Sequence, residues 1–272
     1  MKTFERLTLL ASVGLLALAS APAMAASFVN GGFESGTFSG WTTGSGYRGN
    51  EDNTQINPGQ FVPGGSLYDP SLNHSAVIGK SYVDPNVGSL IGSTVYSGNY
   101  SARVEDTTYG GYASTVQQQV NNYTDSSIFF AYKAVLDGAH GPDEAATMQV
   151  LLTDVTTGSV LVNQMYNAST SGGGGGGGFV FDSSSGAYYT PTWQIIQLNT
   201  PIIGHDYLLQ VLGSDCEPTG HYGYVYLDGF GSVLPPSTVP LPASLPMFGL
   251  SILTLGGTAG LLRRRRNAGR AA

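Results

Sequence analysis

A long apolar segment near the C-terminus constrains this 272-residue chain more than any other feature. Residues 245–262 form an uncharged, mostly apolar run that stops at four consecutive arginines, Arg263, Arg264, Arg265 and Arg266. A run of this length is just long enough to enter or cross a bilayer, and arginines at its end favour the cytoplasmic side. We therefore expect a transmembrane helix within residues 244–272, with the bulk of the protein facing outward.

The N-terminus carries the features of an export signal. Lys2 and Arg6 precede an apolar run over residues 7–19, and Ala23-Met24-Ala25 has the small-x-small form that signal peptidase cuts. We expect residues 1–25 to form a signal helix that brings the chain to the export machinery and is then removed. An uncleaved membrane anchor is the alternative, but the apolar run is short and a cleavage site follows it.

Between the body and the apolar run lies a proline-rich linker, residues 233–243, which ends in Val239, Pro240, Leu241, Pro242 and Ala243. This VPLPA motif, the hydrophobic segment and the arginine cluster together resemble the PEP-CTERM class of bacterial sorting tails. The resemblance implies an exosortase, a membrane-embedded cysteine transpeptidase, as partner. It also implies transient anchoring in the inner membrane, followed by delivery to the cell surface or extracellular matrix. A plain membrane anchor is the alternative, although it has no use for two spaced prolines that keep the backbone extended.

The segment between the two ends is acidic. Residues 26–243 contain 17 Asp and Glu but four basic residues, which leaves about 13 net negative charges. Nucleic acid is excluded as a partner, because binding phosphates requires clustered cations. The acidity suits an extracellular domain whose carboxylates hold calcium. Cys216 is the one cysteine of the sequence, so an intramolecular disulfide is excluded; this residue is either buried or paired with another chain.

Residues 26–232 are expected to fold as a single all-β domain, an antiparallel jelly-roll sandwich. Segments rich in β-branched and aromatic residues alternate with turn residues, which is typical of strands. The predicted strands cover residues 128–135, 147–155, 160–166, 193–199, 207–212 and 222–230. Thr156-Thr157-Gly158 predicts a hairpin turn. The glycine run at residues 172–178 and the polar residues 44–92 are expected to be loops.

Three further segments resemble the galactose-binding-like jelly rolls, a superfamily with many carbohydrate-binding modules. They are FVNGGFESGTFSGW at residues 28–41, SGNYSARV at residues 97–104 and YVYLDGF at residues 224–230. The resemblance implies an N-terminal strand followed by a turn in the first segment. It also implies a structural Ca²⁺ held by Glu34, Asp228 and nearby carbonyls. Calcium takes about six to eight oxygen ligands, which two carboxylates and loop carbonyls can supply. The alternative is that Glu34 is a solvated turn residue and Asp228 a hydrogen-bonded strand end.

A row of tyrosines lies in the last predicted strand. Tyr222, Tyr224 and Tyr226 share one parity, and Val225 and Leu227 share the other, so tyrosines and aliphatic residues should face opposite sides. The tyrosines either form a platform for stacking sugar rings or pack within the body, and packing is the favoured interpretation. In the loop before this strand, Asp215 and His221 are expected to form hydrogen bonds that fix the loop.

The sequence does not favour an enzyme. Its four histidines, His74, His140, His205 and His221, are scattered, and no zinc-protease or serine-hydrolase motif is present. Asp143 and Glu144 belong to the densest polar cluster, which a polar loop explains best. The favoured function is a non-catalytic surface or matrix protein that associates with extracellular polysaccharide. The alternatives are a carbohydrate-binding module and, less favoured, a glycoside hydrolase with an unrecognised carboxylate pair.

Overall fold

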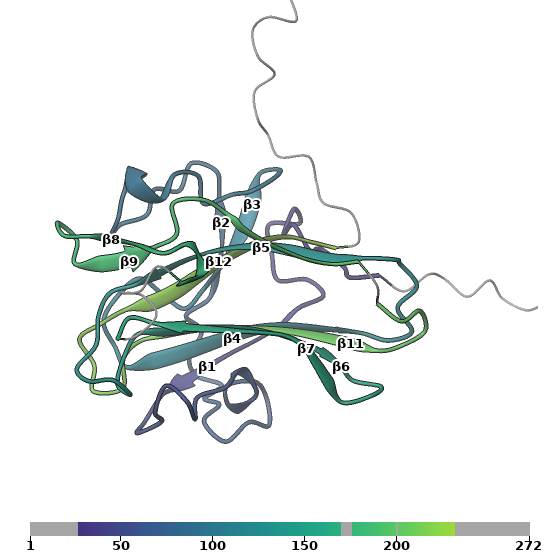
Figure 1. Cartoon of the computed structure of the whole chain (residues 1–272), viewed down its shortest axis with the longest axis horizontal. Coiled ribbons are helices and arrows are strands. Elements are labelled where there is room, and N and C mark those ends of the chain that lie inside the picture. Colours follow the sequence, from purple (N-terminus) through teal and green to yellow (C-terminus); the bar gives the residue numbers. More distant parts are fainter. Residues whose placement is uncertain (1–26, 170–175, 200, 232–272) are drawn as a thin grey trace, which may run out of the picture.

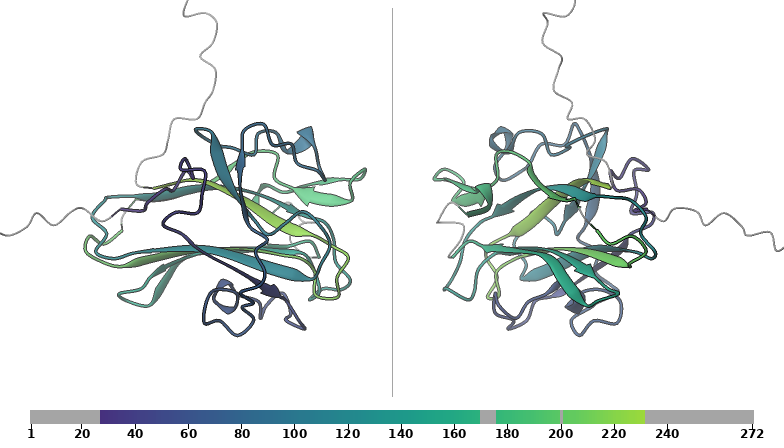
Figure 2. Two further views of the ribbon diagram at one scale, coloured as in Figure 1. Left: turned by 180° about the vertical axis from the view of Figure 1, so that it is seen from behind. Right: turned by 45° about the vertical axis from the view of Figure 1, so that its right-hand side comes forward.

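The computed structural model describes residues 27–169, 176–199 and 201–231, which fold into a sandwich of two antiparallel sheets (Figure 1). Two further directions of view show the same two layers (Figure 2). The five-stranded sheet has the order β1 (Thr42–Tyr47), β4 (Tyr112–Val120), β11 (Tyr207–Ser214), β6 (Thr147–Asp154) and β7 (Ser159–Asn167). The predicted all-β sandwich is therefore confirmed, and the two predicted terminal helices lie outside the described residues.

The second sheet has seven strands. Its order is β2 (Ala76–Gly79), β3 (Tyr100–Val104), β12 (Gly223–Gly231), β5 (Ile128–Leu136), β9 (Ala187–Tyr189) and β8 (Val180–Asp182), and β10 (Gln194–Leu198) also pairs with β5. Three short 3₁₀ turns complete the elements: η1 (Pro58–Gln60), η2 (Ser89–Ile91) and η3 (Gly176–Gly178). The rest of the glycine run, residues 172–175, lies outside the described residues. No helix within the described residues has the length and apolar character needed to cross a membrane.

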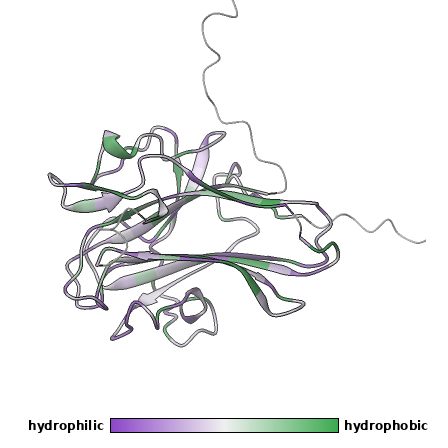
Figure 3. Ribbon diagram, viewed as in Figure 1, coloured by the Kyte–Doolittle hydropathy of each residue, from purple (hydrophilic) through white to green (hydrophobic). Residues whose placement is uncertain are grey.

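The strands predicted from residue type are confirmed, each with ends that differ from the prediction by two residues or fewer. The hairpin turn is also confirmed, because Asp154 pairs with Ser159 across it and Gly158 has the left-handed backbone (φ +71°) that glycine adopts without strain. Strand β5 is buried along its whole length. Its continuous apolar run is typical of a strand that is buried on both faces. Figure 3 shows hydrophobic stretches in β5 and in the β6–β7 hairpin.

Two expectations for the first half of the chain are wrong. Residues 28–41 form turns instead of an N-terminal strand. The left-handed backbones of Asn30 (φ +53°) and Phe33 (φ +55°) interrupt any extended run there. Residues 44–92 are not only loop, because they contain most of β1 and all of β2. The small residues of the TTGSGY segment in β1 pair with β4 and let another loop approach the sheet closely.

The main core lies between the sheets, and its centre is formed by alternate residues of the long strands. Val116 of β4, Val150 of β6 and Val211 of β11 face Phe130 of β5 and Val225 of β12 within one buried cluster. Each such side chain contributes about 1.5–3 kcal/mol by leaving water. Two smaller clusters lie on the outer faces. One surrounds Tyr224 and Tyr226 on the seven-stranded sheet, and the other places Ile56 and Phe61 on the five-stranded sheet.

The two ends of the described body meet. The N–H of Phe230, in the last strand, donates to the carbonyl of Gly31 over 3.0 Å. The rings of Phe28 and Phe230 lie 3.9 Å apart between centroids, and Trp41 packs on Phe230 at 5.7 Å. The turns of residues 28–41 thus pack beside the last strand, β12.

Candidate functional site

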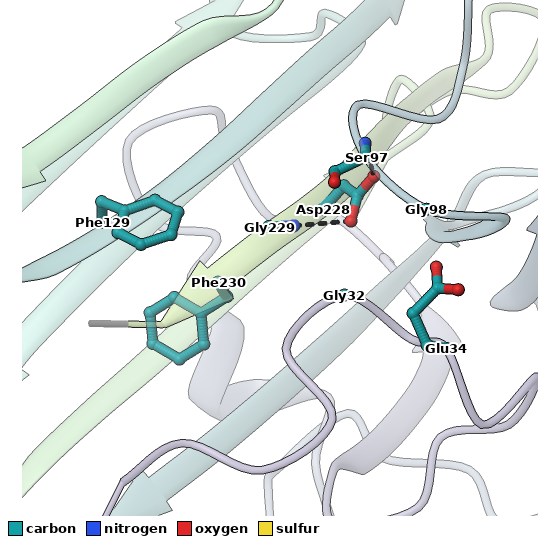
Figure 4. Close-up of a pocket in the computed structure, with 8 residues that line it drawn as sticks. All are labelled: Gly32, Glu34, Ser97, Gly98, Phe129, Asp228, Gly229 and Phe230. Atoms are coloured by element: carbon teal, nitrogen blue, oxygen red, sulfur yellow. Dashed lines mark hydrogen bonds between the residues drawn. The ribbon is translucent and has the colours of Figure 1, made fainter. Parts of the chain in front are cut away.

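A hollow of about 190 Å³ lies where the first turns, the segment before β3 and the end of β12 come together (Figure 4). Both residues predicted to bind calcium, Glu34 and Asp228, line this hollow, together with Gly32, Ser97 and Gly98. Asp228 lies against Ser97, and Glu34 lies beside Gly98 (Figure 4). The fold therefore brings the two predicted residues to one place, although 194 positions separate them in the sequence.

Asp228 is fully buried and holds the segment before β3. Its Oδ2 accepts the N–H groups of Tyr96 (2.7 Å) and Ser97 (3.0 Å), and its Oδ1 accepts the N–H of Gly229 (2.6 Å). Burial raises the pKa of Asp228 to about 7; the nearby charge of Glu34 adds to the rise and the three N–H groups oppose it. Ionising this carboxyl is therefore costly unless a cation is close.

Glu34 holds the other side of the same segment. Its Oε1 accepts the N–H groups of Asn99 (2.8 Å) and Tyr100 (3.0 Å), and its Oε2 accepts the Asn99 amide at 3.3 Å. Gly98 passes so close that a Cβ there would lie 2.3 Å from Oε1, and its φ of +72° also requires glycine. The backbone conformation thus favours glycine at position 98, and a larger side chain there would also displace the Glu34 carboxylate.

The two carboxylates of the hollow can supply part of the about six to eight oxygen ligands that Ca²⁺ takes. A carboxylate offers about four lone-pair sites, and three are used on Glu34 and three on Asp228, so each retains one. Within the described residues, neither carboxylate forms an ion pair with a basic side chain. Oxygen donors with no nitrogen or sulfur among them suit Ca²⁺.

The tyrosine row of β12 is buried. Tyr224 and Tyr226 are fully covered and Tyr222 nearly so, whereas Val225 and Leu227 face the inter-sheet core. The predicted alternation is confirmed, and the row packs inside the body, so it is not a sugar platform. Trp41 is also excluded from that role, because it is 8% exposed and its indole N–H donates to the carbonyl of Asn30 at 3.1 Å.

The outer face of the five-stranded sheet carries a polar group that the sequence did not indicate. Because Val116 and Val211 point into the core, their neighbours Gln117 and Gln210 point outward. The Gln210 amide donates to Gln117 Oε1 at 2.7 Å, and the Gln149 amide donates to Asn163 Oδ1 at 2.8 Å. We call Gln117, Gln149, Asn163 and Gln210 the amide row. The buried Gln149 Oε1 has no hydrogen-bond partner among the described residues.

The other residues predicted from the sequence lie away from this hollow or outside the described residues. Asp215 forms hydrogen bonds as predicted, because its carboxylate accepts the N–H groups of Tyr112 and Gly223. His221 contributes its backbone carbonyl, which accepts the N–H of Cys216, while its buried Nδ1 has no partner among the described residues. Asp143 and Glu144 lie in the loop between β5 and β6, and neither of them lines the hollow of Glu34 and Asp228. The sorting motif Val239–Ala243 and the arginines 263–266 lie outside the described residues.

No protein-family model matches the sequence, and no curated protein is significantly similar to it. Solved structures with a similar fold include the module TmCBM61 in complex with β-1,4-galactotriose (12% identity, TM-score 0.37, 75% of this chain and 95% of that one). A carbohydrate-binding module specific for non-crystalline cellulose matches with 11% identity, a TM-score of 0.36 and coverage of 74% and 92%. The K1 adhesin domain of Lys-gingipain from Porphyromonas gingivalis W83 matches with 13% identity, a TM-score of 0.35 and coverage of 74% and 94%. At these identities and TM-scores, the similarity assigns neither a ligand nor a family to this chain.

Proposed function

We propose that this chain is an exported, non-catalytic surface or extracellular-matrix protein, delivered through its VPLPA tail by an exosortase-type enzyme and associated with extracellular polysaccharide. The supporting observation is that the two ends of the folded body meet at Gly31 and Phe230. Cleavage after residue 25 and cleavage at residues 239–243 would both fall outside this contact. The body could therefore lose both flanking segments without losing a strand of either sheet.

Changing the two motif prolines tests the sorting step. In the native host, the double variant Pro240→Ala/Pro242→Ala is expected to remain in the membrane fraction at full length, because the extended backbone that the enzyme grips is lost. The matched control is Pro235→Ala/Pro236→Ala, which changes two prolines of the same linker outside the motif and should be released like the unaltered protein. Equal release of both variants would contradict the proposal.

The body is further proposed to hold a structural Ca²⁺ between Glu34 and Asp228. The ion would supply a positive charge beside the buried carboxylate of Asp228 and the exposed carboxylate of Glu34. It would also tie the first turns and the segment before β3 to the last strand. The chain's own residues already bring these three segments together, so the role of the ion is to stabilise their arrangement.

Calcium is expected to stabilise the chain after EGTA treatment. At a free concentration 100 times the dissociation constant, the gain in unfolding free energy should be about 2.7 kcal/mol. Calorimetric titration and thermal unfolding measure it. Glu34→Gln and Asp228→Asn should abolish the gain, whereas Asp69→Asn, at an exposed carboxylate bonded to Ser71, should not. Calcium that neither releases heat nor raises the melting temperature would rule out the site.

The pH dependence of the calcium-free chain gives an independent readout. The folded pKa of Asp228, about 7, lies above its ordinary value of 3.8, so protonation favours the folded state. This contribution is fully present below about pH 4 and is lost as the pH rises through about 7. The stabilisation by calcium should therefore increase between about pH 4 and pH 7, because the ion and the proton compete for the same carboxylate. The difference in unfolding free energy between the unaltered chain and Asp228→Asn isolates the contribution of Asp228.

A carbohydrate-binding module is a second candidate function, favoured by the amide row. Amide groups match the donors and acceptors of sugar hydroxyls, and Gln149 Oε1 is an acceptor in need of a donor. If a glycan array yields a ligand, Gln210→Ala should weaken its binding about 5- to 30-fold, the effect of 1–2 kcal/mol. Gln197→Ala is the control, because Gln197 is an exposed glutamine in β10, which belongs to the other sheet. Equal affinity of both variants would exclude this face.

A further inference from the structure

Three metal-binding side chains that are far apart in the sequence meet at one end of the sandwich. His140 belongs to the loop between β5 and β6, and Cys216 and His221 belong to the loop between β11 and β12. One nitrogen of each histidine and the sulfur of Cys216 all lie within 4.8 Å of one another. Cys216 Sγ is 3.5 Å from His140 Nδ1, and the two imidazole rings are 4.6 Å apart between centroids.

Backbone contacts hold these side chains in place. The N–H of Cys216 donates to the carbonyl of His221 at 3.0 Å, which closes the loop and fixes the two residues side by side. The N–H of His140 donates to the carbonyl of Glu144 at 3.0 Å in the facing loop. Gly138 lies directly against the His221 ring, because a Cβ at that position would be 2.6 Å from His221 Cδ2. The arrangement therefore does not depend on long, freely rotating chains.

The cluster lacks a partner for one of its own atoms. His221 Nδ1 is buried and has no hydrogen-bond partner among the described residues. Such an orphan atom is uncommon in folded proteins and calls for an explanation, of which an ion is one. Cys216 is fully buried, whereas His140 is exposed, so the group is accessible to an ion from the side of His140.

We infer that His140, Cys216 and His221 form a zinc site. Three protein ligands of nitrogen and sulfur with a fourth position for water are typical of Zn²⁺. Tetrahedral coordination at about 2.3 Å for sulfur and about 2.0–2.1 Å for nitrogen places ligand atoms roughly 3.3–3.6 Å apart. The pair Cys216–His140 already has this spacing, at 3.5 Å. A nitrogen of His221 lies within 4.8 Å of both ligand atoms, so this ring completes the set of three.

A second group of candidate metal ligands contains no buried atom that lacks a hydrogen-bond partner among the described residues. His74, Glu105 and Asp106 also lie close together, but His74 Nδ1 is bonded to Glu105 Oε1 at 2.7 Å. The second oxygen of Glu105 accepts the hydroxyl of Ser114 at 2.7 Å. These groups satisfy one another, so the ion is assigned to the cluster that contains an orphan nitrogen.

Co²⁺ is a suitable probe, because its absorption spectrum shows whether the Cys216 thiolate binds the metal. The full-length chain is purified under reducing conditions, stripped of metal and titrated with Co²⁺. We expect one Co²⁺ per chain, with a near-ultraviolet sulfur-to-cobalt charge-transfer band that Zn²⁺ abolishes. His140→Ala changes an exposed side chain and should leave the fold intact, yet weaken zinc binding at least about 10-fold in competition with a chromogenic chelator. Cys216→Ser should remove the charge-transfer band.

Two matched variants separate this site from other histidines and from calcium. His205→Ala removes a histidine that is bonded to Asp154 at 2.7 Å, and Glu34→Gln changes the proposed calcium ligand. Both should bind zinc as the unaltered chain does. Absence of the charge-transfer band, or equal zinc affinity of His140→Ala and the unaltered chain, would overturn the inference. Thermal unfolding without metal confirms that each variant is folded before it is titrated.

Discussion

Arg48→Ala is expected to lower the free energy of unfolding by about 3–5 kcal/mol, because several acceptors would be left without a donor at a cost of about 1–3 kcal/mol each. The guanidinium is fully buried. It donates to the carbonyls of Glu51 (2.9 Å), Ala145 (2.7 Å) and Asp215 (2.6 Å), and to Asn53 Oδ1 at 2.8 Å. Without it, these acceptors from separate loops would face a cavity and remain unpaired.

Urea unfolding with an unchanged slope measures this loss. Arg103→Ala is the matched control, because Arg103 is only partly buried. It donates to the carbonyl of Glu105 at 3.0 Å and, over longer distances of 3.3 and 3.4 Å, to the Tyr82 hydroxyl and the His74 carbonyl. We expect about 1 kcal/mol there. A loss at Arg48 no greater than at Arg103 would show that the loops hold together without the guanidinium. The loops that Arg48 joins also carry His140 and Cys216, so Arg48→Ala should weaken zinc binding as well.

Asp84→Ala is expected to cost about 3–5 kcal/mol through a different group of contacts. The buried Asp84 carboxylate accepts the hydroxyls of Tyr224 (2.9 Å) and Tyr226 (2.7 Å), and the N–H groups of Asn86 (2.8 Å) and Val87 (2.9 Å). Burial holds the pKa of both tyrosines far above the ordinary value, so the hydroxyls remain donors at every accessible pH. Removing the carboxylate leaves these donors without an acceptor.

A double-mutant comparison isolates the part that comes from the hydroxyls. In a Tyr224→Phe/Tyr226→Phe background, Asp84→Ala should cost at least about 1 kcal/mol less than in the unaltered chain, because no hydroxyl is left unpaired. Urea unfolding of the four proteins measures the difference. If Asp84→Ala lowers the free energy of unfolding equally in both backgrounds, the hydrogen bonds from the two hydroxyls to Asp84 add nothing to stability. The tyrosine row would then be held by packing alone.

Residue type and alternation predicted six of the twelve strands that the structure describes, but they missed β4 and did not predict the contacts between distant segments. The apolar run of β5 and the aromatic alternation of β12 are local signals, and the structure confirms both. Asp84 gave no such signal, because its partners are 140 positions away in another strand. The contacts of Lys133 were also not predictable from the sequence. Lys133 lies in the middle of an apolar strand, and its ammonium donates to the carbonyls of Ser93 and Pro191.

The sequence predicted two residues of the candidate site but not the contacts that join them, because those contacts also connect distant segments. Glu34 and Asp228 came from a resemblance between short motifs, and the fold places both at one hollow, but their shared contact with residues 96–100 was not visible in the sequence. The histidines looked scattered because their spacing follows no metal-binding motif. Only the pairing of β5 with β12 brings His140 beside His221. The one signal available was that a histidine and the only cysteine share a short loop, DCEPTGH.

The intact mass of the chain isolated from its native host tests the central claim most directly. The account predicts one polypeptide that begins near Ala26 and ends within Val239–Ala243, carrying any attached group at that new end. A polypeptide that still ends at Ala272, in a host with a competent processing enzyme, would contradict it.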